Sequence, residues 1–485
     1  MSQYFSFNKS YINGKWVEGE TDRIFHNLNP FDDTTVADIA VASKAQVESA
    51  FEAANEAQKE WAKDAELRRS VIEKVIAYFK DNQQEIVDVL VAESGSSELK
   101  SNVEVDFTVA DLEESLKMID QIGKPHTVES SIPDKVNKVY RLPLGVISSI
   151  SPFNFPLYLS MRTIAPALAL GNAVVHKADI QTGLSGGSVI AKAFEEAGIP
   201  AGIFNSILTK TSEIGDTMIT NPYTELISFT GSTGVGKHIG QVAGGLLKHT
   251  ALELGGNNPF VVLKDANVDQ AVKAAIMGKY LHQGQICMSI NRIIVHEDVY
   301  EEFANKFVEH TKQIPYGNPK DSSTIIGPLI NHGEMDKALN IIEKSKEAGH
   351  ELLLEGKQEG NVLTPFIFGN VKNDSNLAQT ELFSPIVSLI KASSDEEAIE
   401  IANDTEYGLS SAVFTGDLVQ GEEFAVQIEA GMTHVNDQTV NTLPNTPFGG
   451  VKGSGMGRFG NPWIVDEFTQ AKWVSVQEKP MNYPF

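Results

Sequence analysis

The chain contains one cysteine, Cys287, and its surroundings make it a candidate for chemistry. A single cysteine cannot form an internal disulfide, so its thiol is either a small core group or a reactive group. Upstream, Glu253 stands between two leucines and before Gly255-Gly256. Desolvation by apolar neighbours raises the pKa of a carboxyl group toward that of a useful base, although a charge at a strand edge would give the same pattern. Thiol and carboxylate together predict a covalent enzyme.

A third group that could act on a carbonyl is Asn154, in the segment Ser151-Pro152-Phe153-Asn154-Phe155-Pro156. The segment follows an expected buried strand at 144–150. Two prolines stiffen the loop, and a rigid amide at the carboxyl end of a strand can donate a hydrogen bond to a developing oxyanion. A proline-framed turn without catalytic function would have the same sequence.

Several segments are typical of nucleotide binding. Gly231, Gly234 and Gly236 follow an expected strand and open a helix, where backbone N–H groups can approach a phosphate. Lys177 ends another expected strand, and this end of a parallel sheet faces the ligand crevice. Glu381 could accept hydrogen bonds from the hydroxyls of a ribose, and Phe383 could pack against a flat ring. A plain turn and a solvated lysine are the alternatives, and the loop 447–455 is either a substrate loop or a long turn.

The composition excludes several classes of protein. The net charge is −25 over 485 residues, and an acidic surface repels phosphate backbones, so we expect no nucleic-acid partner. No stretch of about 18 apolar residues could span a bilayer, and the first residues do not read as a signal peptide. With a single cysteine, this indicates a cytoplasmic protein without membrane contact. No histidine spacing indicates a metal site.

The elements needed to position these groups alternate along the chain. Residues 43–120 predict helices by their apolar spacing. From 144 onward, expected strands at 144–150, 174–177, 204–208, 226–230, 259–263 and 292–295 alternate with expected helices at 185–197, 269–281 and 300–314. Such alternation predicts parallel sheets covered by helices on both faces. The fold class is therefore α/β, with two doubly wound, Rossmann-like domains and a small β element from the 121–142 hairpin and the tail.

In this order and spacing, the segments resemble the aldehyde dehydrogenase superfamily, from Tyr11-Ile12-Asn13-Gly14-Lys15-Trp16 to Pro447-Phe448-Gly449-Gly450. The sequences of three segments are similar to those of the benzaldehyde/vanillin dehydrogenase branch: residues 151–156, Val175-His176-Lys177-Ala178-Asp179 and residues 283–288. The resemblance implies a nicotinamide-dinucleotide domain over 1–120 and 143–252, a catalytic domain over 253–455, and an oligomerisation arm over 121–142 and 470–485. It also implies a homodimer or homotetramer.

The resemblance further implies a role for each matched residue. Cys287 would form a thiohemiacetal with an aldehyde, Asn154 and the Cys287 N–H would bind the oxyanion, and Glu253 would activate the water that hydrolyses the thioester. The cofactor contacts would come from Lys177, Ser151, Phe153, Gly231, Ser232, Gly236, Leu254, Glu381 and Phe383.

Two positions depart from the family pattern. Many NAD-preferring members carry a glutamate three residues after the matched lysine, where this chain has Ile180. Loss of that acid removes repulsion against a 2′-phosphate, so we expect use of both NAD and NADP. His282 stands where many relatives have asparagine, five residues before the thiol, and a Cys–His nucleophile pair is one interpretation of it.

The expected substrate is an aromatic aldehyde, by resemblance to the branch. The pocket wall would be formed by Phe155, Tyr158, Arg162, Ile286 and Met288. The apolar members of this set would equally suit a medium-chain aliphatic aldehyde, and Arg162 could clamp the distal carboxylate of a semialdehyde. A relative that transfers the acyl group to coenzyme A would be expected to lack Glu253, and a non-catalytic protein of this fold would be expected to lose catalytic groups that this chain retains.

Overall fold

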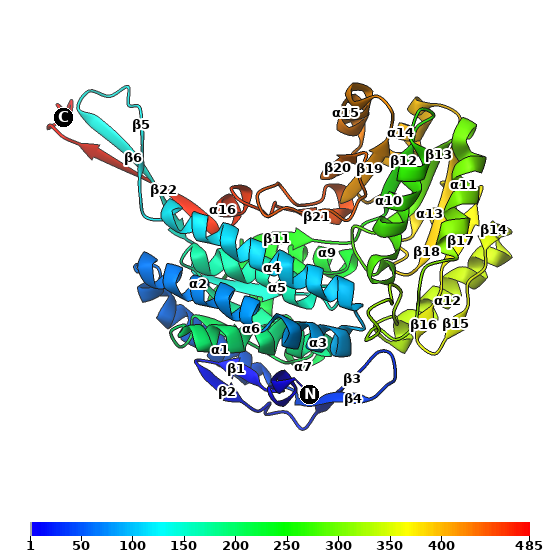
Figure 1. Cartoon of the computed structure of the whole chain (residues 1–485). Coiled ribbons are helices and arrows are strands. Elements are labelled where there is room, and N and C mark those ends of the chain that lie inside the picture. Colours follow the sequence, from blue (N-terminus) through cyan, green and yellow to red (C-terminus); the bar gives the residue numbers. More distant parts are fainter. Residues whose placement is uncertain (1) are drawn as a thin grey trace.

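The computed structural model describes residues 2–485. Two α/β bodies lie side by side, and a narrow arm projects away from the first of them (Figure 1). Each body is built on a largely parallel sheet with helices on both faces, and the arm is a small antiparallel sheet. The fold class predicted from the sequence is therefore confirmed.

The first body contains a sheet of eight strands in the order β2-β1-β9-β8-β7-β10-β11-β21. Its five central strands are parallel, and both edges are antiparallel. The strands are β1 (Ser10–Ile12), β2 (Lys15–Val17), β7 (Val146–Ile150), β8 (Ala173–Lys177), β9 (Phe204–Ser206), β10 (Thr224–Thr230), β11 (His249–Glu253) and β21 (Gly455–Met456). A separate hairpin pairs β3 (Ile24–Leu28) with β4 (Thr35–Ala40).

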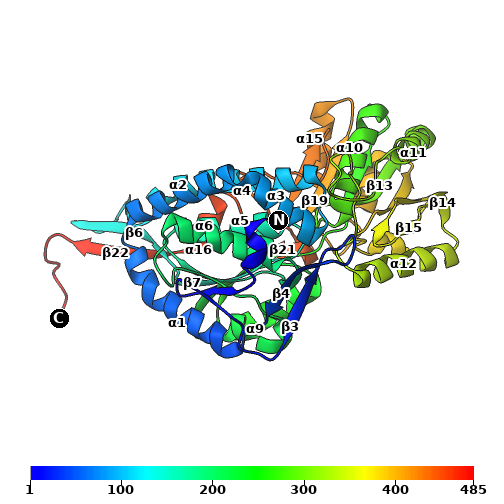
Figure 2. The same ribbon diagram turned by 60° about the horizontal axis from the view of Figure 1, so that its bottom comes forward.

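The helices of this body cover both faces of its sheet (Figure 2). Alternate residues of one strand enter different clusters: Val146 packs with α1, whereas Ile147 packs with α5 and α6. This alternation is what a strand buried on both sides requires. The helices are α1 (Lys44–Trp61), α2 (Ala65–Asp81), α3 (Gln83–Ser94), α4 (Glu98–Met118), α5 (Pro156–Ala169), α6 (Val189–Ala197), α7 (Thr211–Ile214), α8 (Thr217–Thr220) and α9 (Thr233–Gly245).

The helical segment predicted over 43–120 divides where the sequence caps its helices. Ser43 and Gln46 form a capping box at the start of α1, and Asp64 and Ser97 accept N–H groups at the starts of α2 and α4. Gly95 ends α3 with a φ of 65°, a conformation that glycine adopts without a steric cost. Local side-chain caps therefore divide one apolar pattern into four helices.

The second body contains seven strands in the order β14-β17-β18-β13-β12-β19-β20, all parallel except β14. They are β12 (Asn258–Val262), β13 (Ile290–His296), β14 (Glu351–Leu354), β17 (Phe366–Gly369), β18 (Ile386–Ala392), β19 (Ser410–Phe414) and β20 (Met432–Val435). One face packs against α10 and α11 and the other against α12, α14 and α15. Its helices are α10 (Val268–Tyr280), α11 (Glu297–Thr311), α12 (His332–Glu347), α13 (Asn376–Gln379), α14 (Asp395–Asn403) and α15 (Leu418–Gln427), and it carries the hairpin β15 (Gln358–Glu359) with β16 (Val362–Leu363). Helix α16 (Trp463–Phe468) instead packs in the core of the first body.

The helix predicted over 185–197 begins differently in the structure. Residues 184–188 form a π-helical turn, and α6 starts only at Val189. The buried carboxylate of Glu93 accepts the N–H groups of Leu184 and Ser185 at 2.9 and 2.7 Å, so these donors have a partner outside the helix.

Among the described residues, no helix is long and apolar enough to cross a membrane.

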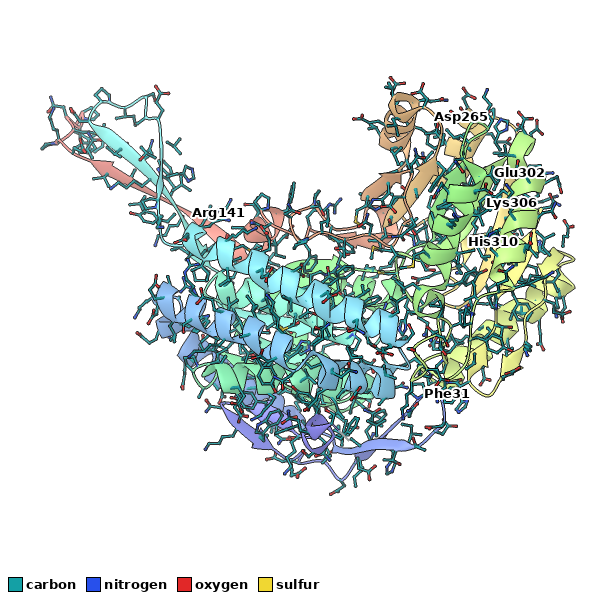
Figure 3. The ribbon with its side chains drawn as sticks, in the orientation of Figure 1. Phe31, Arg141, Asp265, Glu302, Lys306 and His310 are labelled. Carbon is teal, nitrogen blue, oxygen red and sulfur yellow. The ribbon has the colours of Figure 1, made fainter. Side chains whose placement is uncertain are left out.

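The arm is a three-stranded antiparallel sheet, in which β6 (Lys135–Pro143) pairs with both β5 (His126–Val128) and β22 (Thr469–Gln477). Arg141 lies at its base, where it pairs with Asp466 and donates to Thr469 Oγ1 at 3.1 Å (Figure 3). Trp473 on β22 is 67% exposed. The domain boundaries and the role of the arm in assembly stay predictions.

We expect the arm to join copies of this chain into a dimer or tetramer, because an exposed strand with a large apolar side chain is suited to pairing. Trp473→Asp should shift the mass measured by light scattering toward the monomer. Tyr483→Asp, at an aromatic that is 71% exposed but lies beyond β22, is the matched control and should leave the mass unchanged. A wild-type chain that is monomeric at micromolar concentration would contradict the expectation.

Candidate active site

A groove of about 660 Å³ is lined by residues from both bodies. The carboxyl ends of the parallel strands β7, β8 and β10 open into it, as expected for a ligand crevice in an α/β sheet. Ten of the site residues predicted from the sequence line this groove: Ser151, Phe153, Asn154, Lys177, Gly231, Ser232, Leu254, Cys287, Glu381 and Phe383.

The thiol of Cys287 reaches the groove from a loop that precedes β13. His282 and Gln283, with φ angles of 50° and 59°, form the left-handed turn that redirects the chain after α10. The backbone oxygen of Cys287 accepts a hydrogen bond from Asn258 Nδ2 at 2.8 Å. A Cβ at Gly256 would lie 2.3 Å from that oxygen, so glycine is required for this close approach. The backbone around Cys287 is therefore held from the second sheet.

The charge state of Cys287 is set by its surroundings. Burial raises the pKa of the thiol to about 12, Arg162 opposes this rise, and the nearby carboxyl groups of Glu253 and Glu381 add to it. A thiol with such a pKa is almost entirely protonated near pH 7. Attack by this sulfur therefore requires a group that accepts its proton.

Glu253 is the last residue of β11 and is 2% exposed. Neither carboxyl oxygen has a hydrogen-bond partner among residues 2–485. Burial raises the pKa of Glu253 to about 7, with smaller opposing effects from Arg162 and Arg458. A carboxyl group with this pKa can exchange protons near neutral pH, as a general base must.

Asn154 is buried in the loop between β7 and α5. Its Nδ2 donates to the backbone oxygen of Gln285 at 2.9 Å, so the amide is directed at the segment that carries Cys287. The fold thus brings together side chains from three distant parts of the sequence: Asn154 follows β7, Glu253 ends β11, and Cys287 comes from the second body. Asn154 and Cys287 line the groove, whereas Glu253 lies outside its lining but close enough to raise the pKa of the thiol.

Glu381 and Phe383 line the groove from the second body. Glu381 Oε1 accepts the N–H of Gly256 at 3.0 Å, and burial raises the pKa of this carboxyl group to about 7. Phe383 meets Phe153 edge to face, with ring centroids 5.9 Å apart. An acid and an aromatic side chain therefore face the groove from the same short segment.

The start of α9 offers unpaired donors to the groove. Ser232 is the N-cap residue, but its side chain makes no capping hydrogen bond. Helical N–H groups without partners form an anion site, and Lys177 adds a positive charge on the same groove. Gly236 is buried outside the groove lining, and a Cβ there would lie 2.2 Å from Leu254 Cδ2. Gly236 thus allows α9 to pack closely on Leu254.

The sequence analysis missed some lining residues, chiefly Asp179 and Thr211. Asp179 Oδ1 accepts the N–H of Gln181 at 2.9 Å, and its charge partly offsets the lowering of the pKa of Lys177 by burial. Its position just after the end of β8 was the available signal. An acid thus lies one residue before Ile180.

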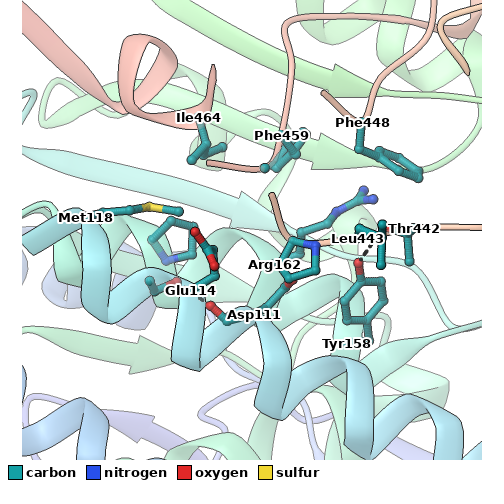
Figure 4. A pocket seen from close by; sticks show the side chains of 14 residues that line it. Asp111, Glu114, Met118, Tyr158, Arg162, Thr442, Leu443, Phe448, Phe459 and Ile464 are labelled. Atoms are coloured by element: carbon teal, nitrogen blue, oxygen red, sulfur yellow. Dashed lines mark hydrogen bonds between the residues drawn. The ribbon is translucent and has the colours of Figure 1, made fainter. Parts of the chain in front are cut away.

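The five predicted pocket residues lie away from the groove lining. Phe155, Tyr158, Ile286 and Met288 belong to the large apolar cluster against which Cys287 packs. Tyr158 and Arg162 line a second cavity, of only about 20 Å³, which is shown in Figure 4. This space holds about one water molecule.

Arg162 is buried within this second cavity (Figure 4). Its guanidinium carbon lies 4.3 and 4.7 Å from the ring centroids of Phe448 and Phe459. Nε and Nη1 have no hydrogen-bond partner in the described chain. Asp111 lines the same cavity, and burial raises its pKa to about 7 against the opposing charge of Arg162.

His282 is fully buried, and burial holds the pKa of its ring well below the usual value. The ring packs edge to face against Phe155, with centroids 6.1 Å apart. Neither ring nitrogen makes a hydrogen bond to any residue that the structure describes. A Cys–His hydrogen bond is therefore not part of this arrangement.

Comparison with known proteins identifies the family. Residues 16–474 match the model of the aldehyde dehydrogenase family, which is nearly the whole chain. The chain belongs to the aldehyde dehydrogenase family. This confirms the resemblance inferred from the order and spacing of the motifs.

Several similar proteins within the family are named for aromatic aldehydes. Vanillin dehydrogenase of Corynebacterium glutamicum is 46% identical over 474 residues, covering 97% of each chain. The solved structure of an NAD-dependent benzaldehyde dehydrogenase from the same species is 42% identical, with a TM-score of 0.90 and coverage of 99% and 98%. Salicylaldehyde dehydrogenase of Pseudomonas putida G7, solved with salicylaldehyde, is 34% identical, with a TM-score of 0.95 and coverage of 98% and 99%.

Proposed function

We propose that this aldehyde dehydrogenase oxidises an aromatic aldehyde to its carboxylic acid with a nicotinamide dinucleotide as hydride acceptor. The observation that carries the proposal is that the one thiol and a directed amide line the same groove, while the unpaired, buried carboxyl group of Glu253 lies outside the lining but close enough to raise the pKa of the thiol. Relatives named for vanillin, benzaldehyde and salicylaldehyde support the aromatic substrate.

In the first step, the sulfur of Cys287 bonds to the carbonyl carbon and the thiol proton passes to a base. Glu253 has a pKa of about 7 and is the nearby carboxyl group suited to receive it. The carbonyl oxygen gains negative charge, which Asn154 Nδ2 and the Cys287 N–H stabilise by hydrogen bonding. Removing one such donor typically costs about 3–4 kcal/mol of transition-state stabilisation.

A nicotinamide dinucleotide held in the groove would supply the acceptor for the hydride of the thiohemiacetal carbon. The groove fits such a cofactor: Glu381 can accept hydrogen bonds from ribose hydroxyls, Phe383 and Phe153 can flank the nicotinamide, and Lys177 with the start of α9 suits the negatively charged part. Loss of hydride leaves a thioester on Cys287. After Glu253 has released the thiol proton to solvent, it takes a proton from water, whose oxygen attacks the thioester carbon. The acid is released, and this second proton passes from Glu253 to the sulfur of Cys287.

Substitutions at Cys287 and Glu253 should separate the two half-reactions. Cys287→Ala should abolish turnover, because no covalent intermediate can form. Glu253→Gln should slow the first burst of reduced cofactor, because the thiol loses its nearby base, and should slow steady turnover still more, because the water that hydrolyses the thioester loses the same base. In the wild-type enzyme, the carboxylate form of Glu253 is lost as the pH falls below about 7, so steady turnover should fall with it. Stopped-flow absorbance of the reduced cofactor measures both phases; full steady-state activity of Glu253→Gln would disprove the base assignment.

We propose that the groove takes NAD and, less well, NADP. Ile180 provides no acid for the adenosine ribose, which favours both cofactors. Asp179 lies on the groove beside Lys177, and its charge disfavours a 2′-phosphate. The similarity to an NAD-dependent benzaldehyde dehydrogenase supports NAD.

The ratio of kcat/KM for the two cofactors tests this assignment. Asp179→Asn should raise the kcat/KM for NADP, relative to that for NAD, by about tenfold, because it removes one negative charge near the 2′-phosphate. Asp265→Asn makes the same change of charge at an acid that hydrogen-bonds Thr415 in the second body, and it should leave the ratio unchanged. A wild-type preference for NAD beyond about a thousandfold, some 4 kcal/mol, would count against dual use.

A semialdehyde is the second candidate substrate, because Arg162 acts on the charge state of Cys287 and has two buried N–H groups without partners. The cavity of about 20 Å³ beside Arg162 would have to widen to admit a distal carboxylate. Benzaldehyde, vanillin and succinate semialdehyde distinguish the candidates by their kcat/KM. We expect the aromatic aldehydes to be preferred at least about tenfold, because the cluster next to Cys287 is apolar. Arg162→Met should leave the ratio between benzaldehyde and the semialdehyde nearly unchanged. The second candidate would be favoured if the wild type preferred the semialdehyde and if Arg162→Met selectively lost activity on it.

A further inference from the structure

Lys100 is a buried cation that the reaction scheme above does not use. It lies near the start of α4 with a fully buried side chain, although its spacing from Glu104 is that of a surface ion pair. Its Nζ lies 2.5 Å from Glu104 Oε2 and 2.6 Å from the backbone oxygen of Asn154. It also lies 4.1 Å from the ring centroid of Phe155. The ammonium group thus contacts the loop that carries the amide of the candidate oxyanion hole.

Glu104 holds the other end of the same loop. Its Oε1 accepts the N–H groups of Leu157 and Tyr158 at 2.8 and 3.2 Å. These are the first donors of α5, whose N-cap residue, Phe155, provides no side-chain cap. One carboxylate from α4 therefore caps α5 and fixes Lys100 at the same time.

Asn154 is restrained at two points. Its backbone oxygen accepts from Lys100, and its Nδ2 donates to the backbone oxygen of Gln285. If the ammonium were removed, a buried carbonyl would lose a charged donor. The side-chain amide would then be held only at its far end, whereas an oxyanion donor is effective when it is oriented before the reaction starts.

We infer that Lys100 is a positioning residue that fixes the amide of Asn154 for stabilisation of the oxyanion. The inference rests on the proposed function, because it assigns Lys100 an effect only through Asn154. His282 packs against the same Phe155 ring but is held neutral by burial, so it adds no competing charge. A buried ion pair contributes little net stability compared with apolar side chains of similar volume, and positioning accounts for this one better than stability does.

A double-mutant cycle tests the inference. Lys100→Met and Asn154→Ala are made singly and together, and the rate of the first burst of reduced cofactor is measured at saturating cofactor and aldehyde. Alone, Lys100→Met should slow the burst by about 10- to 100-fold, with little change in the KM for the cofactor. In the Asn154→Ala enzyme, the same substitution should slow it less than about threefold, because the amide that Lys100 positions is absent.

The outcomes separate this inference from the proposed function. If Asn154→Ala leaves the burst unchanged, the oxyanion role of Asn154 fails and the inference fails with it. If Asn154→Ala slows the burst but Lys100→Met costs the same in both backgrounds, the oxyanion role stands and Lys100 acts only on stability. Non-additive losses support positioning.

Two further variants control for folding. Lys100→Met with Glu104→Gln leaves no unpaired buried charge and keeps a side-chain oxygen for the first N–H groups of α5. It should show the same coupling to Asn154→Ala if the single variant does not fold. Lys279→Met is the matched control, because Lys279 is equally buried but its Nζ contacts Asn291 Oδ1 at 3.2 Å. Its burst rate should stay within about twofold of the wild type.

Discussion

Desolvation of ionisable groups is the constraint on which the site depends. Burial raises the pKa of Cys287, Glu253 and Glu381, and Glu253 has no hydrogen-bond partner within residues 2–485 to offset it. An unpaired carboxyl group is costly in a folded protein and is retained at sites where a shifted pKa is useful. The same burial that keeps the thiol protonated makes a base necessary, and it brings the pKa of that base to about 7.

Close backbone packing makes this burial achievable. Gly256 and Gly255 have no Cβ, so the chain after β11 passes directly beside the Cys287 carbonyl and the Glu381 carboxylate. Gly236 has the same effect for α9 and Leu254. Gly236 belongs to the glycines that predict a phosphate-binding turn, but in the structure it lets α9 pack against Leu254. The network of Lys100 and Glu104 extends the same dense packing to the loop of Asn154.

Features of this fold that depend on neighbouring residues can be predicted from the sequence, whereas features that depend on remote contacts cannot. Helices over 43–120 and strands such as 226–230 were found because their apolar periodicity is local. The π-helical turn at 184–188 has no local signal in the sequence, and the carboxyl group that accepts its first N–H groups, Glu93, is remote in sequence. Asp179 follows the end of β8 in the sequence, but its place on the groove depends on the folded arrangement of both bodies. The burial of Lys100 cannot be predicted from its spacing to Glu104, because i, i+4 spacing is the same on any helix face.

The sequence by itself determined the family, the α/β class and the residue types that can perform the chemistry, because these follow from the order of motifs and from the periodicity of apolar side chains. Only the tertiary structure decided how those residues meet. Cys287, Glu253 and Asn154 come from separate elements; Cys287 and Asn154 line a groove between two sheets, and Glu253 is buried close enough to act on the thiol. Their pKa values and hydrogen bonds depend on long-range packing, which sets the local polarity and cannot be read from neighbouring residues.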